Sequence, residues 1–190
     1  MILRKVFAFT LVELMIVITI MALIGTVGYM NYAYSQNKMN LNFTSKDISQ
    51  ALYNARNMAV NGLDSSSGNV SIGVFFDNSL GNNNKIELYT YPYDMDIASE
   101  DLISTSKKTF LKEIDFYKGI SIVNVEGKDK FLFLFQAVTG SGYYYYWDST
   151  PGKKDFVGSK IDIKVSLGAN GTTTLSKDLN YIVGTNIIDY

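Results

Sequence analysis

A single carboxylate stands inside a long apolar run near the start of the chain. Glu13 is the only charged residue at positions 6–37, and positions 14–30 are almost all apolar. A carboxylate at the centre of a bilayer costs roughly 2.5–3.5 kcal/mol, and less near the interface, so such a residue is a functional candidate by default. The alternative is a tolerated Glu close enough to the lipid headgroups for its side chain to reach them.

Five consecutive aromatic residues, YYYYW at positions 143–147, form the one aromatic cluster that could be a binding surface. On a β-strand Tyr143, Tyr145 and Trp147 share one face, which could stack on sugars or on single-stranded nucleic acid. The alternative is that one face of the run lies in the core and the other packs against a neighbour.

Arg56 has two possible roles. It either anchors a helix through a carboxylate or backbone carbonyls, or its side chain is solvated.

The residue types that the chain lacks exclude several kinds of catalytic and metal-binding site. The chain has no Cys and no His, which rules out disulfides, thiolate chemistry, Cys/His metal sites and His-based catalytic triads. A polar loop at residues 92–108 contains four acidic residues, Asp94, Asp96, Glu100 and Asp101, but their spacing fits no complete set of calcium ligands. We therefore expect no metal, no cofactor and no enzymatic activity.

The apolar run is long enough to cross a membrane. Positions 14–30 approach the ~20 residues that span a ~30 Å hydrocarbon core, and residues 9–12 extend the run. Three tyrosines follow by position 34, as in the aromatic belt at a membrane surface. Arg4 and Lys5 precede the run, which places the N-terminal side in the cytoplasm and the bulk of the chain outside.

We expect residues 1–8 to be a leader and residues 9–61 to form one long helix that spans the membrane in its first half. Gly62 lies where a helix C-cap is expected. Beyond the apolar run, five apolar residues recur at helical spacing on one stripe: Leu41, Ile48, Leu52, Ala55 and Ala59.

Residues 70–190 change to the two-residue period of β-strands. Residues 70–76 are predicted to be a half-buried strand, with a returning strand at 85–91. Residues 109–118 and 120–125 are expected to form a hairpin around Gly119.

The later strands complete the predicted domain. Residues 131–136 are apolar on both faces, which predicts a central strand covered on both sides. Residues 160–167 and 172–177 should pair around Asn170-Gly171, followed by one or two closing strands at 179–183 and 186–189. The predicted fold class is α+β: a long N-terminal helix packed on a C-terminal antiparallel β-sheet domain.

The segment AFTLVELMIVI at residues 8–18 resembles the prepilin motif of type IV pilins and type II secretion pseudopilins. The resemblance implies a type IV pilin-like fold, cleavage between Ala8 and Phe9 by a prepilin peptidase, N-methylation of Phe9, and Glu13 as the assembly carboxylate. The family usually has Gly where this chain has Ala8. After cleavage, Glu13 could pair with the N-terminal amine of a neighbour displaced along the axis, which relieves two desolvated charges at once.

A second resemblance points to a subfamily. ARNMA at residues 55–59 is similar to the A-R-x-x-A segment that ends the helix in GspH/FimT-type minor pilins. Some of these bind DNA through basic residues after a C-terminal Gly. Here Gly184 is followed by uncharged TNI, and 17 Lys and Arg face 18 Asp and Glu, so DNA binding is not expected.

Together these features predict a structural subunit, a minor pilin or pseudopilin of a type IV pilus or type II secretion filament. Its partners would be other pilin subunits, the prepilin peptidase and methylase, the membrane assembly platform and membrane lipid. We expect a single-pass cytoplasmic (inner) membrane protein with its C-terminal domain outside, assembled into a periplasmic or extracellular filament. The alternative is a monomeric membrane-anchored binding module or adhesin that uses the aromatic run as its receptor or glycan site.

Overall fold

The structure is a computed structural model of the 190-residue chain. It describes residues 10–62, 69–79, 83–93, 102, 107–147, 154–168, 175–183 and 187–189. The chain divides into two compact units, Met1–Met39 and Asn40–Tyr190, and each is described by itself. Helix α1 (Leu11–Asn61) contributes residues to both units.

In the first unit, α1 exposes its apolar side chains. An 18-residue window of the helix has a mean hydropathy of 2.3, and none of that window is buried. Two hydroxyls are satisfied inside the helix: Thr19 Oγ1 donates to the Met15 carbonyl and Thr26 Oγ1 to the Ala22 carbonyl, both at 2.8 Å. These bonds remove the cost of placing an unpaired hydroxyl in lipid. The helix therefore has the length and composition of a membrane span.

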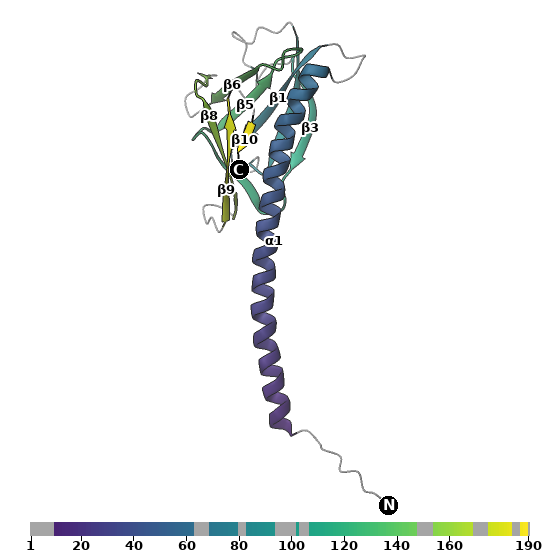
Figure 1. Ribbon diagram of the computed structural model, residues 1–190, viewed down its shortest axis with the longest axis vertical. Helices are drawn as coiled ribbons and strands as arrows, with labels where there is room; N and C mark the ends of the chain where they lie inside the picture. The colour runs from purple at the N-terminus through teal and green to yellow at the C-terminus, as the bar shows by residue number, and fades with distance from the viewer. Residues whose placement is uncertain are drawn as a thin grey trace, which may run out of the picture. The chain divides into compact units, whose positions relative to one another are not determined.

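The second unit combines the last turns of α1 with two antiparallel sheets (Figure 1). The six-stranded sheet has the order β3 (Thr109–Asp115), β2 (Lys85–Pro92), β1 (Val70–Asp77), β5 (Lys130–Phe135), β6 (Gly142–Trp147) and β7 (Lys154–Asp155). The four-stranded sheet has the order β10 (Ile187–Asp189), β9 (Leu175–Ile182), β8 (Lys160–Leu167) and β4 (Ile120–Val125). The predicted fold class, a long apolar helix packed on antiparallel sheets, is confirmed.

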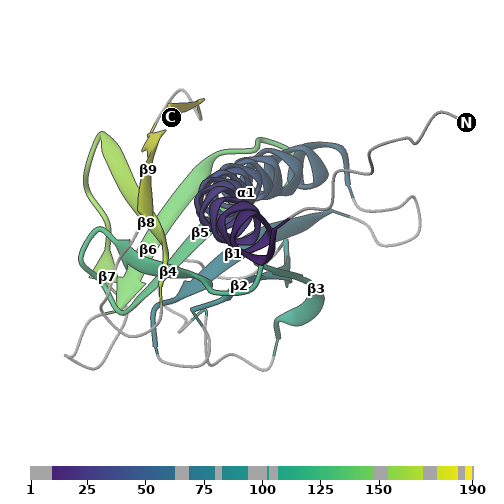
Figure 2. The same ribbon diagram turned by 90° about the horizontal axis from the view of Figure 1, so that it is seen from below.

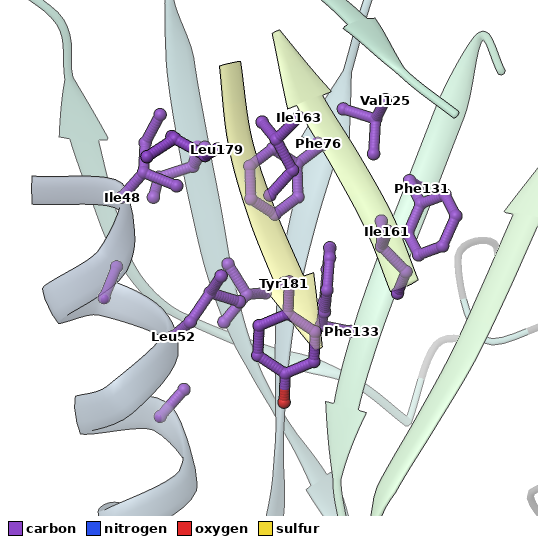
Figure 3. Close-up of a cluster of buried hydrophobic side chains, with 14 of the residues drawn as sticks. Ile48, Leu52, Phe76, Val125, Phe131, Phe133, Ile161, Ile163, Leu179 and Tyr181 are labelled. Atoms are coloured by element: carbon purple, nitrogen blue, oxygen red, sulfur yellow. The ribbon is translucent and has the colours of Figure 1, made fainter. Parts of the chain in front are cut away.

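The core of the second unit lies between the helix and the two sheets. The predicted helical stripe is buried, from Leu41 at 4 % exposure to Ile48 and Ala55 at 0 %. Figure 3 shows Ile48 and Leu52 pointing from α1 towards β9. Both sheets contribute to the same cluster, with Phe133 from β5 and Tyr181 from β9. In Figure 2, which views the chain from below, β8 and β9 lie together to the left of β5, and β1, β2 and β3 lie to its right.

Strand β5 is central, as its sequence predicts, because it pairs with β1 on one side and β6 on the other. The face of this sheet away from the helix carries a second buried cluster: Phe75, Tyr91, Leu102, Leu132, Leu134 and Tyr145. A Cβ at Gly73 would lie 2.6 Å from Cε2 of Tyr91, so only glycine leaves room for that ring. The Tyr91 hydroxyl donates to the Leu102 carbonyl at 2.9 Å, which ties Leu102 to the sheet.

Several strand predictions were wrong. Strand β1 is buried on both faces rather than half-buried, because the second cluster covers its outer side. Residues 109–118 and 120–125 form no hairpin: β3 pairs with β2 in one sheet and β4 with β8 in the other. The expected separate strands at 172–177 and 179–183 are replaced by one strand, β9, which pairs along the whole of β8.

Some predictions lie outside the described residues. They concern the leader and Phe9, the acidic loop around Asp94, the Asn170-Gly171 turn and the stretch that follows Gly184.

Candidate assembly site at the start of the apolar helix

Glu13 is bound to Thr10 at the first turn of α1. The backbone N–H and the Oγ1 hydroxyl of Thr10 donate to Oε2 of Glu13 at 2.9 and 3.0 Å, and the Glu13 N–H donates to Oγ1 at 3.2 Å. The Leu14 N–H donates to the Thr10 carbonyl at 3.2 Å, the first backbone bond of the helix. Thr10 is therefore the N-cap, and Glu13 is the third helical residue of a reciprocal capping box.

This capping box was not predicted from the sequence, where Glu13 was interpreted only as a functional carboxylate or as a tolerated Glu near the lipid headgroups. The signal was present, since a Thr three residues before a Glu and ahead of an apolar run is the sequence pattern of the box. The box pairs donors that a helix N-terminus otherwise leaves unsatisfied.

The box leaves Glu13 able to bind a further donor. Both bonds from Thr10 end on Oε2, and in the described part of the chain Oε1 accepts no hydrogen bond. A carboxylate offers about four acceptor positions, so an amine can bind without breaking the box. The side chain is exposed in this chain. The site therefore presents one oriented negative charge at the end of an apolar helix, with Ala8 and Phe9 immediately before the described residues.

The aromatic run does not form an open three-residue surface. Tyr145 is only 4 % exposed and lies in the second buried cluster, with Trp147 half-buried beside it, while Tyr143 is 39 % exposed. On the opposite face, Tyr144 enters the main core, where its hydroxyl lies 3.3 Å from that of Tyr181. The aromatic run therefore contributes a side chain to the buried cluster on each face of the sheet.

The structure fits neither prediction for Arg56 completely. The residue is partly exposed, but its Nε is buried, and within the described residues this atom has no hydrogen-bond partner.

Comparison with known proteins gave a match at the N-terminal end of the chain, which includes the first turns of α1. Residues 3–29 match the family model of the prokaryotic N-terminal methylation motif. This motif is the hallmark of type IV pilins and pseudopilins, and it is structural rather than enzymatic. Neither the curated proteins nor the solved structures gave a match. The chain therefore carries the pilin-type methylation motif on a pilin-like α+β fold, with a helix that fits a single-pass membrane anchor.

Proposed function

We propose that this chain is a structural subunit, a minor pilin or pseudopilin, that is polymerised through α1 into a type IV pilus or type II secretion filament. The observation that carries the proposal is the methylation motif at residues 3–29 with Glu13 as the single carboxylate of the apolar run. The same motif supports processing by a prepilin peptidase between Ala8 and Phe9, followed by methylation of the new amine on Phe9.

The capping box suggests how the subunits join. Cleavage before Phe9 would leave a charged amine one residue ahead of Thr10, at the edge of the apolar phase. In a stack of parallel helices, Oε1 of one Glu13 can accept from the amine of a neighbour. The separation of four positions between Phe9 and Glu13 corresponds to a longitudinal step of about 6 Å at ~1.5 Å per residue. Pairing relieves both desolvated charges, whereas a buried charge left alone is costly.

The orientation follows from charge. Arg4 and Lys5 lie ahead of the apolar segment, so residues 40–190 would be outside the cytoplasmic membrane, where a filament grows. The alternative function is a monomeric binding module that uses the aromatic run as its binding surface. The structure favours this alternative less than the sequence did, because Tyr145 is buried.

Intact-mass analysis of the protein extracted from membranes tests the proposal. In cells that have the peptidase, we expect the loss of residues 1–8 and the gain of one methyl group. In cells without the peptidase, the mass should correspond to the full chain. Retention of Met1 in peptidase-positive cells would refute the filament subunit and leave the monomeric anchored module as the better account.

A further inference from the structure

Arg56 carries a polar atom that the second unit buries without a partner. Its Nε is shielded from solvent, has no hydrogen bond among the described residues, and no ion pair in that part of the chain includes its guanidinium. An unpaired buried donor loses its hydration without compensation, and the loss is larger for a charged group. Native structures keep few such groups, so this one calls for an explanation.

The Arg56 side chain lies against the turn that contains Gly140. Gly140 has a φ of 64°, and a Cβ at this position would lie 3.5 Å from both Cγ and Nε of Arg56. The turn that contains Gly140 is fixed to the helix, because the Val138 N–H donates to the Ala59 carbonyl at 2.9 Å. The Arg56 side chain therefore packs against this turn up to its Nε.

The guanidinium borders a pocket of about 180 Å³. Four lining residues share one face of α1: Ser49, Leu52, Tyr53 and Arg56. Phe135 of β5 and Tyr181 of β9 line the opposite side, and Figure 3 shows Leu52 pointing towards the Tyr181 ring. No described lining residue is acidic.

The phenols beside Arg56 do not neutralise it. Burial raises the pKa of Tyr144 and of Tyr181, and although the positive charge of Arg56 acts to lower both values, the balance is a rise. Both hydroxyls are therefore uncharged at physiological pH. The pocket combines a cation with apolar and phenolic walls and holds no negative charge from the described chain.

We propose that this pocket, the Arg56 pocket, binds the carboxylate of a Glu or Asp side chain presented by a neighbouring protein subunit. A guanidinium matches a carboxylate because its planar donors can form two parallel hydrogen bonds, and in Arg56 the two Nη groups, which are not among the buried unpaired atoms, are the donors open to a ligand. The apolar walls suit the CH₂ groups that carry the carboxylate. The proposal rests on the proposed function, since a filament would bring other subunits against this surface.

The size and rim of the pocket favour a protein side chain over a free small molecule. Pockets for small molecules usually measure about 300–1,000 Å³, well above this volume. Tyr53, which lines the pocket, is 63 % exposed, and two exposed valines lie where α1 meets the Gly140 turn, Val60 at 41 % and Val138 at 52 %. Arg and Tyr are enriched at the energetic centres of protein interfaces, so a partly buried Arg beside an exposed Tyr suits such a centre.

The isolated protein provides a test that does not depend on filament formation. The chain has two Arg residues, Arg4 and Arg56, so protein labelled with ¹⁵N-arginine gives two Nε–Hε NMR signals when the leader is retained. We would titrate the full chain in detergent micelles with sodium propionate, which corresponds to the Glu side chain. Propionamide and sodium chloride at matched ionic strength are the controls, and Arg4 is the internal reference.

We expect the Arg56 signal to shift saturably with propionate, with half-saturation at millimolar concentration, and at least tenfold more weakly with propionamide. The Arg4 signal should follow ionic strength alone. Equal shifts with propionate and chloride, or no shift, would overturn the carboxylate site. Tighter binding of glucuronate than of propionate would overturn the protein side chain as the ligand and indicate an acidic sugar.

A second test identifies the source of the carboxylate in cells. A photo-cross-linking amino acid replaces Tyr53 at the rim, and a matched control replaces Val157, which is 95 % exposed and does not line the pocket. We expect cross-links from position 53 to another subunit, lost at least fivefold in Arg56→Gln and retained in part in Arg56→Lys. Thermal melts of both variants verify folding.

The two tests separate this inference from the proposed function. Cross-links that persist unchanged in folded Arg56→Gln protein would overturn the pocket as an interface even if filaments form. A propionate-specific shift combined with an uncleaved N-terminus would support the carboxylate site while refuting the filament subunit.

Discussion

Removal of the Thr10 hydroxyl tests whether the capping box prepares Glu13 for assembly. Thr10→Val is nearly isosteric, but it deletes the donor to Oε2 of Glu13 at 3.0 Å and the acceptor of the Glu13 N–H at 3.2 Å. The backbone N–H at position 10 can still donate to Oε2, as it does at 2.9 Å in this chain. Loss of an N-cap hydroxyl costs about 1 kcal/mol. That free energy corresponds to a change of about fivefold in an equilibrium constant.

The assay compares the amount of protein in sheared filaments with the amount in membranes, in cells that have the assembly machinery. We expect the filament-to-membrane ratio to fall about fivefold for Thr10→Val. Thr10→Ser keeps the hydroxyl and should behave as the unaltered protein. Intact mass of each variant verifies that processing between Ala8 and Phe9 is unchanged, since position 10 is close to the cleavage site.

Two changes at Glu13 separate capping from charge. Glu13→Gln can still complete a capping box, because Gln also serves at this position, but it removes the negative charge. If charge pairing drives assembly, Glu13→Gln should lower the ratio much more than Thr10→Val does. Glu13→Ala should lower it as strongly while leaving membrane insertion intact, because a costly carboxylate is removed. Wild-type incorporation of Glu13→Gln would refute charge pairing, and equal ratios for Thr10→Val and Thr10→Ser would refute the role of the box.

Three further predictions concern the second unit. Gly73→Ala places a Cβ 2.6 Å from the Tyr91 ring and should lower the free energy of unfolding by about 1–3 kcal/mol in denaturant titrations, with much less effect in a Tyr91→Ala background. Burial raises the pKa of Asp77, but hydrogen bonds from Ser79 and the charge of Lys130 more than offset this and lower it on balance. The stability that Asp77 provides should therefore be present at pH 7 and be lost as the pH falls below about 4, and Asp77→Asn should flatten that part of the profile. Fluorescence anisotropy should show no DNA binding tighter than about 10⁻⁴ M at physiological salt, whereas micromolar, salt-sensitive binding would show that the Lys side chains converge.

The sequence by itself determined the features that depend on local composition and spacing. The apolar run, the carboxylate inside it and the methylation motif occupy one continuous stretch, and the motif comparison agrees with that interpretation. The buried stripe of the helix around Ile48 and Leu52 could also be predicted from the sequence, because residues on one face of a helix recur at a fixed interval. Strand β5 showed its central place through apolar residues on both faces. The capping box was equally local, and its Thr-x-x-Glu spacing would have revealed it.

Only the tertiary structure decided which strands pair and which side chains become covered. β3 and β4 follow one another in sequence, but they join different sheets, because pairing depends on partners far along the chain. Tyr145 is buried because Leu102, more than forty residues earlier, belongs to the cluster on its face of the sheet. The burial of the Arg56 Nε likewise involves the turn at Gly140, which lies against the Arg56 side chain. Periodicity tells which residues share a face, whereas burial depends on what the rest of the chain places against that face.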